Sequence, residues 1–136
     1  MRVFVDTNVL VSAFATRGLC ADILRLVLLE HTLIISERVL SELENNLANK
    51  LGVRESLPKE ILAFLQMYHV EPEPERPLPV PESDPDDQWI LASAASADSD
   101  VFITGDNELL DLRMELHRPE IVTPREFWEL LTERIG

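Results

Sequence analysis

The chain has 136 residues, of which 46% are apolar and 27% are charged, and its formal net charge at pH 7 is −13. This length suits one domain with a sizeable core rather than two domains, and the composition is that of a soluble globular protein. The acidity argues against a protein that coats nucleic acid without sequence preference, because such proteins need a basic surface. It leaves open an enzyme that grips one phosphodiester through a metal ion. No apolar run approaches the roughly 20 residues that cross a bilayer, and the single cysteine, Cys20, fits a reduced, cytoplasmic setting.

The first half of the chain predicts strands that alternate with helices. Short apolar runs rich in β-branched residues favour buried strands, and apolar residues three and four apart favour amphipathic helices. The expected elements are a strand at Arg2–Val5, helices over residues 8–15 and 21–30, a strand over residues 32–35, and a helix that Ser36 caps and that runs to about Leu51.

The second half continues the alternation after a proline-rich stretch. Six of the nine prolines lie in residues 72–85, which are expected to run extended over the surface. The other expected elements are a helix that Pro58 opens, an edge strand at Val70, a helix over residues 85–97, strands over 101–104 and 121–122, and a final helix over 123–133. We therefore expect residues 1–136 to form a single domain of the α/β class, a three-layer α/β/α sandwich with a central, mainly parallel sheet.

Four acidic residues stand where such a fold would bring them together. Asp6 follows the first strand, Asp106 follows the strand over residues 101–104, Glu42 lies in the helix after the second strand, and Asp87 begins the helix after the proline-rich stretch. Ligands of open parallel sheets bind beyond the carboxyl ends of the strands. Packed carboxylates repel one another, so a protein that gathers four of them either protonates some or holds a cation.

Each acid also has an ordinary structural explanation. Asp6 and Asp106 stand where an N-cap is expected, and Asp84, directly before Pro85, fits a helix cap better than a catalytic role. Helical spacing does not choose between Glu42 and Glu44, and either alone would be a solvated surface acid.

Taken together, four sequence motifs are more specific than these single residues. In order and spacing they resemble the PIN-domain family of metal-dependent ribonucleases, and the closest likeness is to small prokaryotic PIN toxins of type II toxin–antitoxin pairs. The motifs are residues 5–13 (VDTNVLVSA), 39–43 (VLSEL), 84–92 (DPDDQWILA) and 103–110 (ITGDNELL).

The resemblance implies that Asp6, Glu42, Asp87 and Asp106 are the catalytic, metal-binding acids. It implies that Asn8 and Thr104 support them, and that Asp84 or Asp86 could assist. Many relatives carry a further acid two residues after the position of Asp106, where this chain has the longer Glu108. Oxygen ligands favour Mg²⁺ or Mn²⁺ over zinc, and such a cation would activate water for in-line attack on a phosphodiester.

The partners expected from the resemblance are an RNA substrate, a cognate antitoxin protein and further copies of the chain in a homodimer or larger homo-oligomer. Arg17, Arg38 and Arg113 could line the mouth of the cleft, but solvated surface charge is the simpler explanation for each of them. Two other Asp-after-strand folds, a haloacid-dehalogenase-like phosphatase and a phosphate receiver, need a later lysine, and no lysine follows Lys59. The alternative is a catalytically silent PIN-like module that binds RNA or protein.

Overall fold

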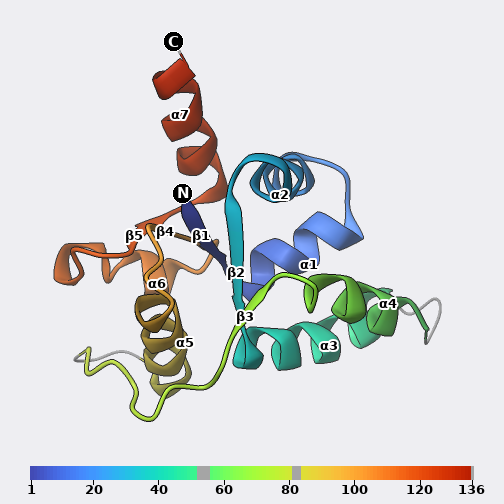
Figure 1. Ribbon diagram of the computed structural model, residues 1–136, viewed down its shortest axis with the longest axis horizontal. Coiled ribbons are helices and arrows are strands. Elements are labelled where there is room, and N and C mark those ends of the chain that lie inside the picture. The colour runs from blue at the N-terminus through green and yellow to red at the C-terminus, as the bar shows by residue number, and fades with distance from the viewer. Residues whose placement is uncertain (52–55, 81–83, 136) are drawn as a thin grey trace.

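A computed structural model describes residues 1–51, 56–80 and 84–135 of the chain. Five parallel strands form one sheet in the order β3-β2-β1-β4-β5, which can be followed across Figure 1. The strands are β1 (Arg2–Val5), β2 (Thr32–Ser36), β3 (His69–Glu71), β4 (Val101–Ile103) and β5 (Glu120–Val122). The predicted strands are confirmed, and the first of them lies at the centre of the sheet. In β1 and β4, Val5 pairs with Ile103, so these two strands end at the same level of the sheet.

Helices cover both faces of the sheet, which confirms the three-layer α/β/α sandwich. The helices are α1 (Thr7–Ala15), α2 (Leu19–Glu30), α3 (Glu37–Leu51), α4 (Ser56–Leu65), α5 (Pro85–Ser96), α6 (Asn107–Leu110) and α7 (Pro124–Ile135), with a 3₁₀ turn at Arg113–Glu115. α1 packs against α2 and α3, α7 packs against α2, and α5 packs against β2 and β3. None of the described helices is long and apolar enough to cross a membrane.

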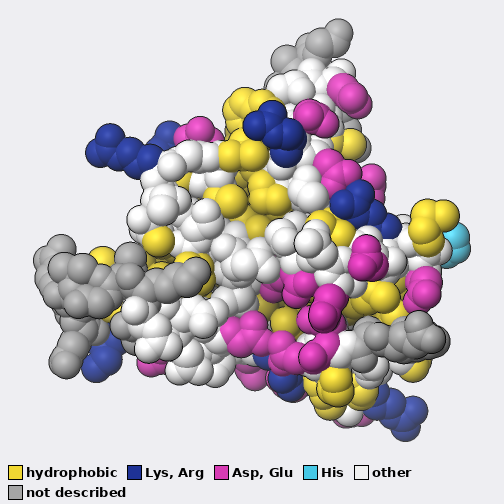
Figure 2. All heavy atoms as spheres, turned by 180° about the vertical axis from the view of Figure 1, so that it is seen from behind, with side chains coloured by type: hydrophobic (Ala, Val, Ile, Leu, Met, Phe, Trp, Pro, Cys, Tyr) yellow, Lys and Arg dark blue, Asp and Glu magenta, His cyan; other side chains and the backbone are white. Residues whose placement is uncertain are grey.

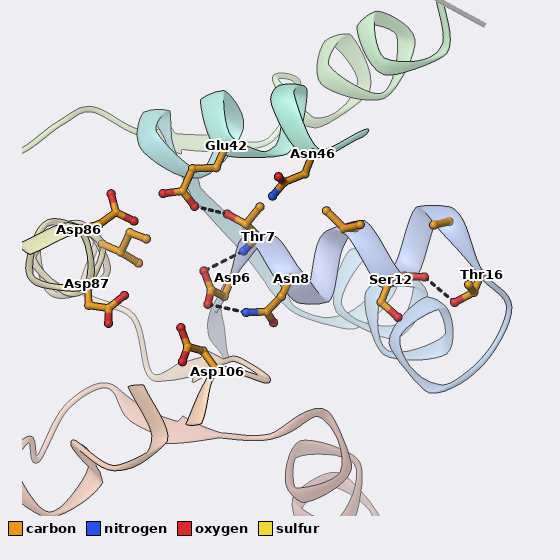
Figure 3. Close-up of a pocket in the computed structure, with 13 residues that line it drawn as sticks. Asp6, Thr7, Asn8, Ser12, Thr16, Glu42, Asn46, Asp86, Asp87 and Asp106 are labelled. Carbon is orange, nitrogen blue, oxygen red and sulfur yellow. Dashed lines mark hydrogen bonds between the residues drawn. The ribbon is translucent and has the colours of Figure 1, made fainter. Parts of the chain in front are cut away.

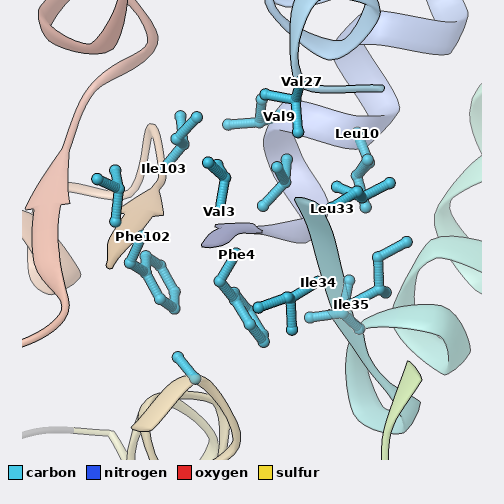
Figure 4. Close-up of a cluster of buried hydrophobic side chains, with 14 of the residues drawn as sticks. Val3, Phe4, Val9, Leu10, Val27, Leu33, Ile34, Ile35, Phe102 and Ile103 are labelled. Carbon is cyan, nitrogen blue, oxygen red and sulfur yellow. The ribbon is translucent and has the colours of Figure 1, made fainter. Parts of the chain in front are cut away.

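The core lies on both sides of the central strands because alternate residues of a strand point to opposite faces. Figure 4 shows Phe4 and Phe102 on the side where α5 lies, and Val3 on the side of α1 with Val9 and Val27. The rings of Phe4 and Phe102 stack with their centroids 5.0 Å apart, and both side chains are fully buried. Each such side chain contributes roughly 1.5–3 kcal/mol by leaving water. This packing fixes β1 beside β4 and thereby fixes the two strand ends that carry Asp6 and Asp106.

The local sequence signals hold with a few differences. Ser36 caps α3 as predicted, since its Oγ accepts a hydrogen bond from the Val39 N–H at 3.1 Å. α4 begins at Ser56, so Pro58 lies inside the first turn, where its missing N–H costs nothing. The short α6 and the 3₁₀ turn were not predicted, because a helix of four residues carries no periodic pattern.

The proline-rich stretch is only partly the surface run that the sequence predicts. Val80 is buried, Leu78 packs against the core, and the Leu78 N–H donates to the Gln88 carbonyl of α5 at 3.0 Å. Residues 81–83 lie outside the described part of the chain. This hydrogen bond holds the segment before α5 against α5 itself, the helix that carries Asp87.

Candidate acidic active site

Asp6 joins the end of β1 to the start of α1 and is 4% exposed. It caps α1, because its Oδ1 accepts a hydrogen bond from the Thr7 N–H at 2.8 Å. Its Oδ2 accepts bonds from the Thr104 hydroxyl at 2.7 Å and from the Asn8 amide at 3.0 Å. The capping explanation and the site explanation therefore both apply to this residue, one through each carboxylate oxygen.

Thr104 and Asn8 bind the loop after β4 to the start of α1. The fully buried Thr104 hydroxyl accepts from the Asp106 N–H at 3.0 Å while it donates to Asp6. The Asn8 carbonyl oxygen accepts from the Gly105 N–H at 2.9 Å. Asp106 itself caps α6 by accepting from the Glu108 N–H at 2.9 Å. These bonds place both predicted supporting side chains between the two strand ends.

Helices α3 and α5 bring two further acids to the same place. Glu42 stands in the second turn of α3, and its Oε2 accepts from the Thr7 hydroxyl at 2.8 Å. Asp87 lies in the first turn of α5 and is 7% exposed. Asp84, in contrast, is exposed; it caps α5 by accepting from the Asp86 N–H at 2.8 Å and does not line the pocket. In the structure, Asp84 therefore acts as the N-cap of α5 and has no direct contact with the pocket.

All four predicted acids line one pocket of about 500 Å³ beyond the carboxyl ends of β1 and β4. Figure 3 shows their carboxylates pointing into a common space from four separate segments, with Asp86 beside them. Acidic side chains also gather on one face of the molecule in Figure 2. The pocket is lined by Asp6, Thr7, Asn8, Val11, Ser12, Ala15, Thr16, Glu42, Asn46, Asp86, Asp87, Ile90 and Asp106.

Burial and mutual repulsion change the acidity of this group. Burial, followed by the negative charges of Asp106, Asp84 and Asp6, raises the pKa of Asp87 to about 7. Burial, followed by hydrogen bonding with the carboxyl of Asp86, raises the pKa of Glu42 to about 7. Burial also raises the pKa of Asp6, although its hydrogen bonds with Thr104, Thr7 and Asn8 oppose the rise. At neutral pH the pocket therefore binds protons that ordinary carboxylates have lost.

The donor set suits a hard divalent cation, because every charged group in the pocket ends in carboxylate oxygens. A cation there would relieve the same repulsion that raises these pKa values. Among the described residues, no three His, Cys, Asp or Glu side chains stand close enough to hold one ion together as they are. The carboxylates share a pocket but would have to turn toward one another to share an ion. The residues fit the cation by chemistry and location.

Two features of the site were not found in the sequence: Thr7 orients Glu42, and Asn46 lines the pocket one helical turn after Glu42. Asp86, which the resemblance offers as an assisting acid, faces the pocket next to Asp87. The i, i+4 spacing of Glu42 and Asn46 was the only available signal for the two missed features. The contacts of Thr7 and Asp86 join distant segments and leave no local pattern.

Of the three arginines that could line the cleft mouth, Arg38 alone reaches the acids. Its guanidinium donates to Asp86 at 2.6 Å and to Glu73 at 3.2 Å, and it lies 5.6 Å from the centre of the Trp89 ring. Arg113 instead pairs with Glu126, and Arg17 does not line the pocket. Trp128, on α7, is 39% exposed and lies outside the buried core.

Comparison with known proteins agrees with this architecture. The family model described as "PIN domain" matches residues 2–108, whereas no curated protein matches the chain in sequence. A toxin–antitoxin complex from Klebsiella pneumoniae is similar in structure, with a TM-score of 0.66 at 19% identity over 90% of this chain and 97% of that one. VapBC2 from Rickettsia felis, bound to a DNA fragment from its promoter, gives 0.63 at 15% identity over 90% and 98%. Mycobacterium tuberculosis VapC20, a sarcin–ricin loop cleaving toxin, gives 0.57 at 17% identity over 80% and 93%.

The fold and the pocket define an α/β protein with an acidic site at the carboxyl edge of a parallel sheet. The family match covers most of the chain, from β1 into α6, and includes all four acids. The chain belongs to the PIN-domain family.

Proposed function

We propose that this protein is a divalent-metal-dependent endoribonuclease that hydrolyses RNA phosphodiesters. The observation that carries the proposal is the convergence of Asp6, Glu42, Asp87 and Asp106 on one pocket. Membership of the PIN-domain family supports nuclease chemistry. The structural similarity to a toxin that cleaves the sarcin–ricin loop supports RNA as the substrate.

In this proposal Asp6, Asp87 and Asp106 hold the cation, Mg²⁺ or Mn²⁺, and Glu42 completes the shell or positions the water. When bound, the cation supplies Lewis-acid chemistry that activates water and offsets charge on the phosphate oxygens. Thr104 and Asn8 hold the Asp6 carboxylate in place through its Oδ2. Thr7 holds Glu42 toward the pocket, so the acid is oriented before any substrate arrives.

The biological setting is also proposed, as the toxin component of a toxin–antitoxin pair. The similar structures from Klebsiella pneumoniae and Rickettsia felis are toxin–antitoxin assemblies, which supports a cognate antitoxin as partner. Assembly into a homodimer or larger homo-oligomer and a cytoplasmic location belong to the same proposal. That residues 1–136 act as one domain is supported by the single five-stranded sheet around which the described elements pack.

The decisive test is Asp6→Asn assayed on a panel of single-stranded RNAs with Mn²⁺ and with chelator. Asparagine retains the oxygen that caps α1, so circular dichroism and the melting curve should show a folded protein. Cleavage should fall by more than about 100-fold, beyond the 10- to 100-fold typical of losing a partner of a metal ligand.

The matched control is Asp111→Asn, because Asp111 is exposed and lies outside the pocket. This variant should cleave like the original chain. Full Mn²⁺-dependent cleavage by Asp6→Asn would refute the assignment. RNA binding with no cleavage by the original chain would favour the catalytically silent binding module instead.

A further inference from the structure

The pocket extends beyond the acids into a region whose described lining residues carry no charge. This end is formed by the later part of α1, through Ser12, Ala15 and Thr16, and by Asn46 of α3. Figure 3 shows Asn46 projecting from α3 toward α1, and Ser12 and Thr16 further along α1 from the carboxylates. We use the name polar arm for this end of the pocket, lined by Ser12, Ala15, Thr16 and Asn46.

Hydrogen-bonding capacity in the polar arm is unused at two positions. The Thr16 hydroxyl donates to the Ser12 carbonyl at 2.9 Å and is therefore committed to α1. In contrast, the Asn46 amide and the Ser12 hydroxyl have no hydrogen-bond partner within residues 1–51, 56–80 and 84–135. Asn8, at the junction with the acids, already uses its amide for Asp6 and Gly105. Asn46 thus offers a free donor and a free acceptor beside the proposed site of cleavage.

The charge of the pocket restricts what the polar arm can bind. Among the residues that the structure describes, no Lys, Arg or His side chain lines the pocket, so a phosphate would find no cationic partner among them. An amide and a hydroxyl instead suit uncharged groups that present both donors and acceptors, such as the edge of a nucleobase and a ribose hydroxyl. Because a paired and stacked base cannot enter a pocket, the strand must be single at this point.

A cation follows the polar arm in the sequence. Arg17 follows Thr16 directly, is exposed, and forms no ion pair within the described part of the chain. Along α1 and the residues directly after it, the order is therefore a carboxylate at Asp6, uncharged polar groups at Ser12 and Thr16, and then an arginine at Arg17. A phosphodiester strand that leaves the acids would meet base-binding groups first and a phosphate-binding group next.

We propose that the polar arm is a nucleotide subsite for single-stranded RNA and that Asn46 is its specificity-determining residue. The inference rests on the proposed ribonuclease function and deepens it. Asn46 reads the base of a nucleotide adjoining the cut, because its amide offers one donor and one acceptor to the exposed edge of an unpaired base. Arg17 contacts the following phosphate and adds affinity without base preference.

The test uses the full chain, Mn²⁺ and a short single-stranded RNA with random sequence, followed by sequencing of the product ends. The original chain should show a preference of about fivefold or more for one base at one position near the cut, the low end of what a paired amide–base contact gives. Asn46→Ala should flatten the preference at that position alone. Arg17→Ala should weaken cleavage of all sequences alike and leave the preference in place.

The matched control is Asn45→Ala, since Asn45 is the exposed neighbour of Asn46 on α3 but does not line the pocket. This variant should keep both the rate and the preference. A melting-temperature rise with Mn²⁺ in Asn46→Ala, equal to that of the original chain, would show that the acids are intact.

Three results would overturn the inference. They are an original chain with no base preference near the cut, a preference that Asn46→Ala retains, and a loss of cleavage in Asn46→Ala with an unchanged sequence profile. If the original chain cleaves no RNA with Mn²⁺, the proposed function itself fails and the subsite falls with it. If the original chain cleaves RNA but shows no base preference that depends on Asn46, the subsite proposal is refuted and the proposed ribonuclease function stands.

Discussion

Replacing Asp87 with asparagine is expected to stabilise the protein at pH 8 in the absence of divalent cations. Asp87 is 7% exposed, and it faces the charges of Asp106 and Asp6. Above pH 7 the folded state must carry this carboxylate ionised among other carboxylates, whereas the unfolded chain exposes it to water. Asparagine has nearly the same shape and removes the charge, so the folded state no longer bears this cost.

The size of the effect follows from the raised pKa. The pKa of Asp87 rises from 3.8 to about 7 on folding, and each tenfold change in proton affinity is worth about 1.4 kcal/mol. The ionised side chain therefore lowers the free energy of unfolding by at most about 4 kcal/mol. The pocket opens to solvent, which screens part of the repulsion, so we expect Asp87→Asn to gain about 2 kcal/mol.

The pH dependence has a definite sign. A carboxyl whose folded pKa is raised stabilises the folded state below about pH 4, and this contribution is lost as pH rises through about 7. The advantage of Asp87→Asn should therefore be largest at pH 8 and clearly smaller at pH 5, where folded Asp87 holds a proton.

Urea unfolding with chelator at pH 5 and pH 8 measures the difference, and thermal melting should show a rise of about 5–10 °C at pH 8. Asp111→Asn, at an exposed position outside the pocket, should stay within about 0.5 kcal/mol of the original chain. If Asp87→Asn is less stable than the original chain at pH 8, or equally affected at both pH values, the electrostatic account of the pocket is wrong.

Further predictions concern the cation, the supporting bonds and the core. Mn²⁺ at 100 times its dissociation constant should add about 2.7 kcal/mol to the free energy of unfolding, and calorimetry should find no such gain in Asp6→Asn. Cleavage at subsaturating Mn²⁺ should increase between pH 6 and pH 8 as Asp87 and Glu42, with pKa values of about 7, lose their protons; a flat profile would contradict it. Thr104→Val should cost about 1–3 kcal/mol, because the Asp6 carboxylate and the Asp106 N–H lose a buried partner; the same change at the exposed Thr32 should cost far less in urea unfolding. Phe102→Ala should cost about 3–5 kcal/mol by opening a cavity beside Phe4, and a smaller loss would mean that the core collapses around the gap.

Much of the fold follows from local sequence patterns, and the elements that were not predicted are the ones without such patterns. The strands at Arg2–Val5 and over residues 101–104 are short apolar runs between clear breaks, and they occupy neighbouring central places in the sheet. Ser36 and Asp84 cap the helices that the sequence assigns to them. The partial burial of the proline-rich stretch depends on its contact with α5, which composition does not reveal.

The ambiguity between Glu42 and Glu44 shows where local patterns end. Both positions lie near the apolar stripe of α3, but Glu42 lines the acidic pocket and Glu44 lines a separate depression with Leu62 and Val70. The packing of α3 against α1 on one side and α4 on the other decides which side chain faces the acids. Helical periodicity gives the width of a face but not the neighbour that the face meets.

By itself, the sequence determined the succession of strands and helices of a parallel α/β protein and put Asp6 and Asp106 at strand ends, because apolar runs and caps act over a few neighbouring residues. Only the tertiary structure decided that Thr7 bonds Glu42, that Arg38 pairs with Asp86, and that Asn46 extends the pocket. The two hydrogen bonds join residues that are 35 and 48 positions apart in the sequence, and Asn46 shares the pocket with residues of other helices. Their geometry is set by how whole elements pack, which no short stretch of sequence encodes.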